Sequence, residues 1–289
     1  MSGARSLATP KARKRIITPR ARTSAILLIG AGRMGGALLK GWIAGKIGPV
    51  IVVEPKPSPE LRKLAKQKKI TLVDAPSKVT ARKLSACLVA LKPQILKHEA
   101  PLLARVAQGG ALMISVAAGT HTDLLFQAWG KKARIIRAMP NTPGAIGQGI
   151  TGLYAAPGAT AADKRKAVQL LSALGETVWV AKEDLIDSVT ALSGSGPAYL
   201  FLMAEAMTEA GVAEGLPRAQ AEMLARATVA GAGALLKADK SPASRLREAV
   251  TSPGGTTAAA LSVLMAKEGL TDLMIRAIHA ARKRAEELR

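Results

Sequence analysis

The residues of this chain that could do chemistry gather in two glycine-rich segments far apart in the sequence. The first, Gly30–Gly35, has glycines at its first, third and sixth positions and follows the apolar run 25–29. In this pattern Gly30 permits a tight turn, Gly32 lets the backbone approach a pyrophosphate, and Gly35 lets the next helix pack on the strand. The segment predicts a dinucleotide site at a helix start. A glycine turn that binds nothing is the simpler alternative.

An acidic residue ends the next apolar run, where it bears on the choice of dinucleotide. Glu54 follows the run 50–53, and a carboxylate at that point usually accepts the ribose 2′-hydroxyl of NAD. Four residues that could pair with the 2′-phosphate of NADP follow closely: Lys56, Ser58, Arg62 and Lys63. The residues alone leave the choice open.

The second glycine-rich segment, Val250–Thr257, has the sequence Val-Thr-Ser-Pro-Gly-Gly-Thr-Thr. A Gly-Gly pair followed by threonines at a helix start offers free backbone N–H groups and a hydroxyl, which suit a carboxylate. The alternative is an ordinary helix start, in which Thr256 or Thr257 is only the N-cap.

Three further segments follow predicted strands: 90–94, 115–119 and 137–143. In an open parallel sheet the carboxyl ends of the strands line the crevice where the nicotinamide binds. Taken singly, each segment could be a turn, and Pro93 could simply start a helix.

The pattern of elements predicts an α/β fold in two parts. Short apolar runs alternate with helical patterns up to about residue 182, which is typical of a mainly parallel sheet covered on both faces. Strands are expected at 25–29, 50–53, 87–91, 111–116, 134–139 and 177–180, and helices at 33–44, 58–67, 95–107 and 161–174. The rest reads as helices at 198–211, 218–236, 257–267 and 271–287. We therefore expect a basic leader (1–24), a dinucleotide-binding domain (25–182) and an all-helical domain (183–289).

The formal charge of the 289-residue chain is +22, and residues 1–24 contribute seven basic and no acidic residues to it. A disordered tail explains this leader most simply, with a transit peptide as an alternative. Nucleic-acid binding is not favoured, because no aromatic residues interleave the charge and no such motif is present.

Cysteine and histidine usage excludes other chemistries. The chain has a single cysteine, Cys87, so no internal disulfide can form and a reducing, cytoplasmic compartment is expected. Because Cys87 lies in an apolar run, we expect it to pack as a small buried apolar side chain. The three histidines (His98, His121 and His279) have no metal-ligand spacing, so no metal site is predicted. No apolar stretch is long enough to cross a membrane.

Six motifs together carry a family resemblance: the glycine-rich start, Ala-Leu-Lys-Pro-Gln (90–94), Val-Ala-Ala-Gly (116–119), Arg-Ala-Met-Pro-Asn-Thr-Pro (137–143), Leu-Ser-Gly-Ser-Gly-Pro-Ala-Tyr (192–199) and Thr-Ser-Pro-Gly-Gly-Thr-Thr (251–257). Their order and spacing resemble pyrroline-5-carboxylate reductase from about Ala25 to the end of the chain. The resemblance implies a Rossmann-type domain followed by an all-α dimerisation domain.

The same resemblance implies reduction of 1-pyrroline-5-carboxylate to L-proline, the last step of proline biosynthesis, by NADPH or NADH, with NADPH preferred. Thr257 would donate a hydrogen bond to the ring nitrogen as the catalytic residue. The implied substrate residues are Glu183, Val250, Gly255, Thr256 and Thr257. The expected cofactor residues are Gly30, Gly32, Arg33, Met34, Gly35, Glu54, Lys56, Ser58, Ala90, Leu91, Lys92, Pro93, Ala117, Ala118 and Asn141.

Small residues along the predicted helices, as in 229–234, predict close helix packing and at least a homodimer. Two other functions remain as alternatives. One is a β-hydroxyacid type of dehydrogenase, but 186–190 lacks the lysine that such enzymes usually carry there. The other is a basic nucleotide- or nucleic-acid-binding protein that uses the leader.

Overall fold

The computed structural model describes residues 24–79 and 83–288, and the predicted leader lies almost wholly outside this range. A single eight-stranded sheet forms the first part of the molecule, with the strand order β3-β2-β1-β4-β5-β6-β7-β8. Its strands are β1 (Ala25–Ile29), β2 (Val50–Val53), β3 (Thr71–Val73), β4 (Leu84–Val89), β5 (Leu112–Ser115), β6 (Arg134–Met139), β7 (Gly149–Ala155) and β8 (Gly175–Trp179). All neighbours pair in parallel except β6 and β7. The predicted mainly parallel α/β sheet is confirmed.

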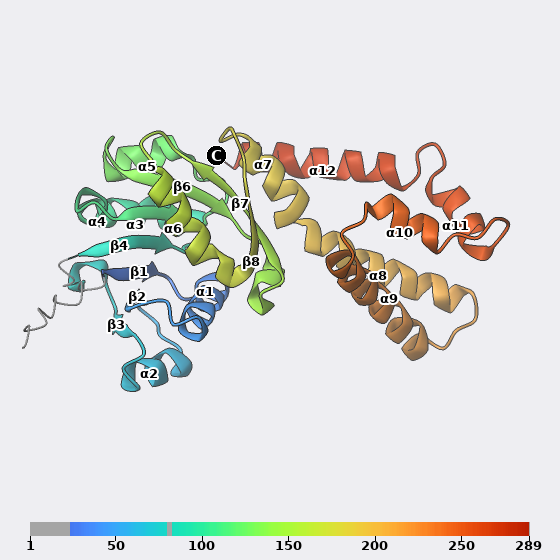
Figure 1. Ribbon diagram of the computed structural model, residues 1–289, viewed down its shortest axis with the longest axis horizontal. Coiled ribbons are helices and arrows are strands. Elements are labelled where there is room, and N and C mark those ends of the chain that lie inside the picture. Colours follow the sequence, from blue (N-terminus) through green and yellow to red (C-terminus); the bar gives the residue numbers. More distant parts are fainter. Residues whose placement is uncertain (1–23, 80–82, 289) are drawn as a thin grey trace, which may run out of the picture.

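Helices cover both faces of this sheet (Figure 1). They are α1 (Arg33–Ala44), α2 (Pro59–Lys66), α3 (Pro93–Glu99), α4 (Ala104–Gln108), α5 (Thr122–Trp129) and α6 (Ala161–Leu171), with short 3₁₀ turns η1 (Pro76–Lys78), η2 (Ala100–Leu103), η3 (Thr142–Ile146) and η4 (Ser172–Leu174).

Two separate cores follow from the alternation of side chains along the strands. Ile26 and Leu28 of β1 face a cluster completed by Trp42 of α1 and by α6, whereas Leu27 and Ile29 face the cluster with α3 and α5. Burying each such aliphatic side chain stabilises the fold by about 1.5–3 kcal/mol. The loops at the carboxyl ends of the strands are thus held on a rigid support.

The second part of the chain is helical throughout. It comprises α7 (Leu185–Val189), the π-helical turn η5 (Thr190–Gly194), α8 (Gly196–Ala213), α9 (Arg218–Ala238), α10 (Ala243–Ala249), α11 (Thr256–Leu264) and α12 (Leu270–Glu287). Figure 1 shows the sheet at one end of the molecule and α8–α11 at the other. Helix α12 runs back from that end and packs against α7 and η5.

Several predicted element boundaries were wrong. The helix expected over 95–107 is α3, η2 and α4 in succession, because Pro101 has no N–H to continue an α-helical ladder. The strand expected at 87–91 is β4, which begins at Leu84 and ends at Val89. Strands β3 and β7 and helices α5, α7 and α10 were not expected.

Candidate functional site

The loop between β1 and α1 has the backbone geometry of a phosphate cradle. Gly30 has φ +83°, and a β-carbon on it would lie 2.9 Å from the backbone oxygen of Ala90. A β-carbon on Gly35 would lie only 2.1 Å from the backbone oxygen of Gly30. By contrast, a β-carbon on Gly32 would meet no described atom within 4 Å. The outer two glycines therefore let the turn and helix pack, and the middle one leaves open space.

Helix α1 presents free donors to that space. Gly32 is its N-cap and carries no side chain to satisfy them, and the first helical bond runs from Gly36 N–H to the Gly32 carbonyl. The N–H groups of Arg33, Met34 and Gly35 thus precede the first intrahelical bond, at the positive end of the helix dipole. This donor set suits a pyrophosphate.

Glu54 lies across the glycine-rich loop. Its Oε2 accepts a hydrogen bond from the Ala31 N–H at 3.0 Å, and its Oε1 accepts one from the Lys56 N–H at 3.2 Å. The carboxylate therefore ties the end of β2 to the loop after β1.

The segment after Glu54 is ordered by its own polar side chains. The Ser58 hydroxyl is the N-cap of α2 and accepts from the Leu61 N–H at 3.3 Å. The Arg62 Nε donates to the Pro57 carbonyl at 3.2 Å, which holds the exposed guanidinium beside this segment. Lys56 and Ser58 are also exposed, so the edge of the site beyond Glu54 is basic.

The loop after β4 lies beside the glycine-rich loop, and the loop after β5 begins beside the end of β4. The Ala90 N–H donates to the Ile29 carbonyl at 2.8 Å, and the Val116 N–H donates to the Val89 carbonyl at 3.1 Å. The next residues in these loops are Leu91, Lys92 and Pro93, and Ala117 and Ala118. Lys92 is the N-cap of α3 and Pro93 its first residue, so Pro93 does start a helix.

Asn141 follows β6 and has a visible structural role. Its side-chain oxygen accepts from the Ile150 N–H at 3.0 Å and so joins the end of β6 to the start of β7.

Glu183 lies on the sheet side of the molecule, in a polar cluster with Thr122, Arg137 and His121. Its Oε1 accepts from the Thr122 N–H and from Arg137 Nη1, both at 2.7 Å, and lies 3.6 Å from His121 Nδ1. Its Oε2 accepts from the Thr122 hydroxyl at 2.5 Å. Burial alone would raise the pKa of Glu183, but these hydrogen bonds outweigh it and hold the pKa below its ordinary value.

Neither Thr122 nor Arg137 was among the predicted site residues, although Arg137 begins the motif 137–143. Arg137 is 2% exposed in the middle of an apolar strand. A buried guanidinium needs an anionic partner, so an arginine inside the run Ile-Ile-Arg-Ala-Met was a signal that could have found it.

The second glycine-rich segment forms a turn before α11. Gly254 has φ +69°, the Gly255 N–H donates to the Ser252 carbonyl at 3.1 Å, and Gly255 is the N-cap. Thr256 and Thr257 are therefore the first two helical residues, and the alternative that one of them is the N-cap is wrong. The first helical bond runs from the Ala259 N–H, so the N–H groups of both threonines precede it.

One chain does not bring the two parts of the predicted site together. Figure 1 shows α10 and α11, which are joined by residues 250–255, at the end of the molecule away from the sheet. The expected cofactor loops lie at the sheet, so within one chain the expected substrate residues Val250, Gly255, Thr256 and Thr257 are remote from them.

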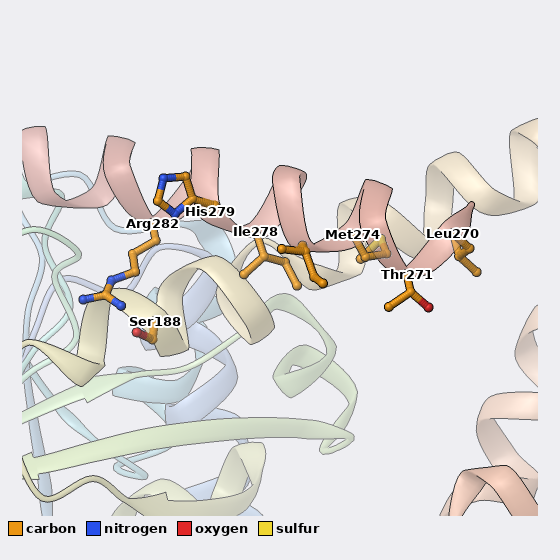
Figure 2. A pocket seen from close by; sticks show the side chains of 8 residues that line it. Ser188, Leu270, Thr271, Met274, Ile278, His279 and Arg282 are labelled. Atoms are coloured by element: carbon orange, nitrogen blue, oxygen red, sulfur yellow. The ribbon is translucent and has the colours of Figure 1, made fainter. Parts of the chain in front are cut away.

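An open groove of about 650 Å³ lies elsewhere, between α7 and α12 (Figure 2). Its lining is largely apolar and includes Leu270, Met274, Ile275 and Ile278 of α12. None of the residues expected from the sequence to bind cofactor or substrate lines it.

Three further observations bear on the kind of site. Cys87 is fully buried and its pKa is raised by burial, so it packs as a small apolar side chain, as predicted. Among residues 24–79 and 83–288, no cluster of three metal-ligating side chains is found. No helix in the same ranges is long and apolar enough to cross a membrane.

The fold and the cradle together define a Rossmann-type nicotinamide-dinucleotide oxidoreductase with a helical C-terminal part. Two family models match: "NADP oxidoreductase coenzyme F420-dependent" over residues 25–119, and "Pyrroline-5-carboxylate reductase dimerisation" over residues 183–288. The chain belongs to the pyrroline-5-carboxylate reductase family.

Individual relatives agree with this membership. The chain is 38% identical over 268 residues to a pyrroline-5-carboxylate reductase of Pseudomonas aeruginosa, covering 92% of this chain and 97% of the relative. The solved structure of a pyrroline-5-carboxylate reductase from Coxiella burnetii is 36% identical, with a TM-score of 0.84 over 92% of this chain and 98% of that one. A Plasmodium falciparum pyrroline carboxylate reductase, solved with NADP bound, is 25% identical, with a TM-score of 0.75 over 92% of this chain and 98% of that one.

Proposed function

We propose that the chain reduces the C=N bond of 1-pyrroline-5-carboxylate to give L-proline, with the substrate carboxylate held at the start of α11. The membership of the reductase family carries this proposal, and it makes the chain an NAD(P)-dependent enzyme of proline biosynthesis. The geometry before α11 supports the placement of the substrate, because uncapped N–H groups beside two hydroxyls suit a carboxylate.

The residues of the segment 250–257 would bind and orient the substrate. The N–H groups of Thr256 and Thr257 bind the carboxylate, and Gly255 and Val250 shape the turn around it. The Thr257 hydroxyl donates a hydrogen bond to the ring nitrogen and so orients the C=N bond. The reduced nicotinamide, when bound, would supply the hydride for the imine carbon, and the ring nitrogen would take up a proton from water, so that the C=N bond becomes the C–N single bond of L-proline. Because the substrate is held in a fixed orientation, proximity lowers the barrier without a strong base.

The residues of the first part fit the dinucleotide. The open space at Gly32 and the free donors of Arg33, Met34 and Gly35 would hold its pyrophosphate. Ala90, Leu91, Lys92 and Pro93, together with Ala117, Ala118 and Asn141, would line the rest of it.

We propose NADPH as the preferred cofactor. Both oxygens of Glu54 already accept backbone N–H groups, from Ala31 in the glycine-rich loop and from Lys56. Beyond it, Lys56, Ser58 and Arg62 form an exposed, basic edge that suits a 2′-phosphate. NADH would then bind more weakly because it lacks the phosphate that this edge would hold.

We propose further that two copies of the chain complete each site. Within one chain the segment before α11 is remote from the sheet, so a second copy must bring its α11 to the cofactor (Figure 1). The helical part exposes many large apolar side chains, among them Phe201, Met223 and Leu224, which favours association through this part. The groove between α7 and α12 in Figure 2 adds apolar surface to the same part.

The division of the chain at residues 182 and 183 belongs to the same proposal. It is supported by the end of β8 at Trp179 and the start of α7 at Leu185. A cytoplasmic location is also proposed, because the single cysteine is a buried thiol.

Isotope transfer tests the reaction itself. NADPH deuterated at either face of nicotinamide C4 is incubated with the enzyme and 1-pyrroline-5-carboxylate. One of the two labelled forms should give L-proline with one deuterium on the ring carbon that was the imine carbon of the substrate. Unlabelled proline from both forms, or no proline at all, would overturn the proposed hydride transfer.

Subunit complementation tests the shared site. Thr257→Ala is mixed with Gly32→Val after dissociation and reassociation. If each site draws on two copies, about a quarter of the sites regain both intact parts and activity returns. A matched mixture of two Thr257→Ala preparations is the control. Activity no higher than the mean of the two parents would mean that each chain builds its own site.

A further inference from the structure

The helical part of the chain contacts the expected cofactor loop at two points, and both contacts come from the ends of that part. The loop is residues 116–121, between β5 and α5, and it contains Ala117 and Ala118. Glu183 lies at the start of the helical part and Leu288 at its end. This paired contact goes beyond the binding roles proposed above, although it rests on the proposed cofactor site.

The first contact is the carboxylate of Glu183. It accepts both the N–H and the hydroxyl of Thr122, the first residue of α5, at 2.7 Å and 2.5 Å. It thereby fixes the point where the loop enters the helix. His121 Nδ1, on the preceding residue, lies 3.6 Å from the same carboxylate.

The carboxylate is itself fixed by the sheet. Arg137 Nη1 donates to it at 2.7 Å, and Arg137 is 2% exposed in β6, next to β5. A charge pair with one side chain this buried holds a defined geometry, because the guanidinium cannot be left without its partner. Glu183 therefore ties the loop to the sheet on which the cofactor would lie.

The second contact is the last turn of the chain. Gly119 has φ +65°, and a β-carbon on it would lie 2.8 Å from the backbone oxygen of Leu288. The end of α12 is thus seated against the middle of the loop, and α12 is anchored on α7 and η5.

We propose that Glu183 is a positioning residue for the cofactor, which holds the loop 116–121 against the sheet, and that the end of α12 supports the same loop. The helical part then influences cofactor affinity as well as substrate binding. The nicotinamide dinucleotide is the ligand concerned, and Glu183 acts on it through the loop and not by contact with the imine substrate.

The test separates cofactor binding from substrate binding. For Glu183→Gln we expect the Kd of NADPH, titrated without substrate, to rise about tenfold, while the KM for 1-pyrroline-5-carboxylate stays within about twofold. Glu209→Gln is the matched control, because it removes an exposed carboxylate bonded to Arg218 at 2.7 Å and should change neither value.

A second variant covers the case in which Glu183→Gln does not fold. The double variant Arg137→Met with Glu183→Leu removes both charges, so no unpaired ion stays buried, but the donors of Thr122 still lose their acceptor. We expect its Tm to exceed that of Glu183→Gln while its Kd for NADPH stays about tenfold weaker than that of the wild type.

Truncation after Glu287 tests the second contact and should also weaken NADPH binding. An unchanged Kd for NADPH in the double variant would overturn the positioning role, as would a rise in the substrate KM alone in Glu183→Gln. Failure of the wild-type protein to bind NADPH would instead count against the proposed function itself.

Discussion

The Thr257 hydroxyl is the side-chain group on which the proposed chemistry depends most, and its removal has a calculable cost. Thr257 is the second residue of α11, and its hydroxyl is proposed to donate to the ring nitrogen. Negative charge develops on the ring nitrogen as the hydride reaches the imine carbon. A hydrogen bond to a charged group contributes about 1.5–3 kcal/mol, so loss of the Thr257 hydroxyl should lower kcat/KM by about 10- to 100-fold.

The structure makes this substitution a clean test. Because Gly255 is the N-cap, Thr257→Ala removes no helix cap and keeps the backbone N–H proposed to bind the carboxylate. Alanine also favours the helix, so α11 should form as in the wild type. Thr257→Ser keeps a hydroxyl and should retain most of the activity.

Thr256→Ala is the matched control. It removes the hydroxyl of the preceding threonine and leaves that residue's backbone N–H in place, so we expect less than about a threefold change in kcat/KM. The assay is the initial rate of NADPH oxidation over a range of 1-pyrroline-5-carboxylate concentrations. A Thr257→Ala enzyme with wild-type kcat/KM, or an equal loss in Thr256→Ala, would refute the assigned role.

Four further predictions concern Gly32, Gly35, Arg62 and Glu183. Gly32→Val should weaken NADPH binding by at least about tenfold and lower the Tm of the free protein less than Gly35→Ala does, because its side chain fills open space. Gly35→Ala should lower the Tm, because its β-carbon would meet the Gly30 carbonyl. Thermal melts of the two glycine variants with and without NADPH check these predictions. A larger loss of Tm in Gly32→Val than in Gly35→Ala would contradict the geometry. Arg62→Gln should raise the KM for NADPH about tenfold and leave that for NADH unchanged, and equal changes for both cofactors would exclude a phosphate contact. The lowered pKa of Glu183 contributes stability that is present above about pH 4.5 and is lost as the pH falls through the folded-state pKa. The difference in unfolding free energy between wild type and Glu183→Gln should therefore shrink below pH 4.5 in urea titrations, and a constant difference would argue against the ionised carboxylate.

Much of the first part could be predicted from local patterns. The strands at 25–29, 50–53 and 134–139 and the helix at 33–44 match β1, β2, β6 and α1 in their bounds, because apolar periodicity and burial agree there. The phosphate cradle between β1 and α1 could also be predicted, because glycines at this spacing have one main structural use.

Strand β7 shows where local patterns fail. Its glycines break the β-branched pattern, and the reason for Gly152 is tertiary: a β-carbon there would lie 2.5 Å from Cγ1 of Val189 in α7. The cluster around Glu183 was missed for a related reason. Arg137 and Glu183 could each be noticed in the sequence, but only the fold brings their side chains and that of Thr122 together.

The substrate segment marks a third limit. The sequence motif predicted its chemistry, but the distance between α11 and the sheet is a property of the whole chain (Figure 1). The proposed sharing of a site between two copies could therefore not be inferred without the positions of the helices in the fold.

Steady-state turnover is the direct test of the proposed reduction of 1-pyrroline-5-carboxylate. The purified protein is assayed with 1-pyrroline-5-carboxylate and either NADPH or NADH, and L-proline is quantified at the same time. One proline should form for each NADPH oxidised, with a higher kcat/KM for NADPH than for NADH. No turnover with either cofactor would contradict the proposed reaction.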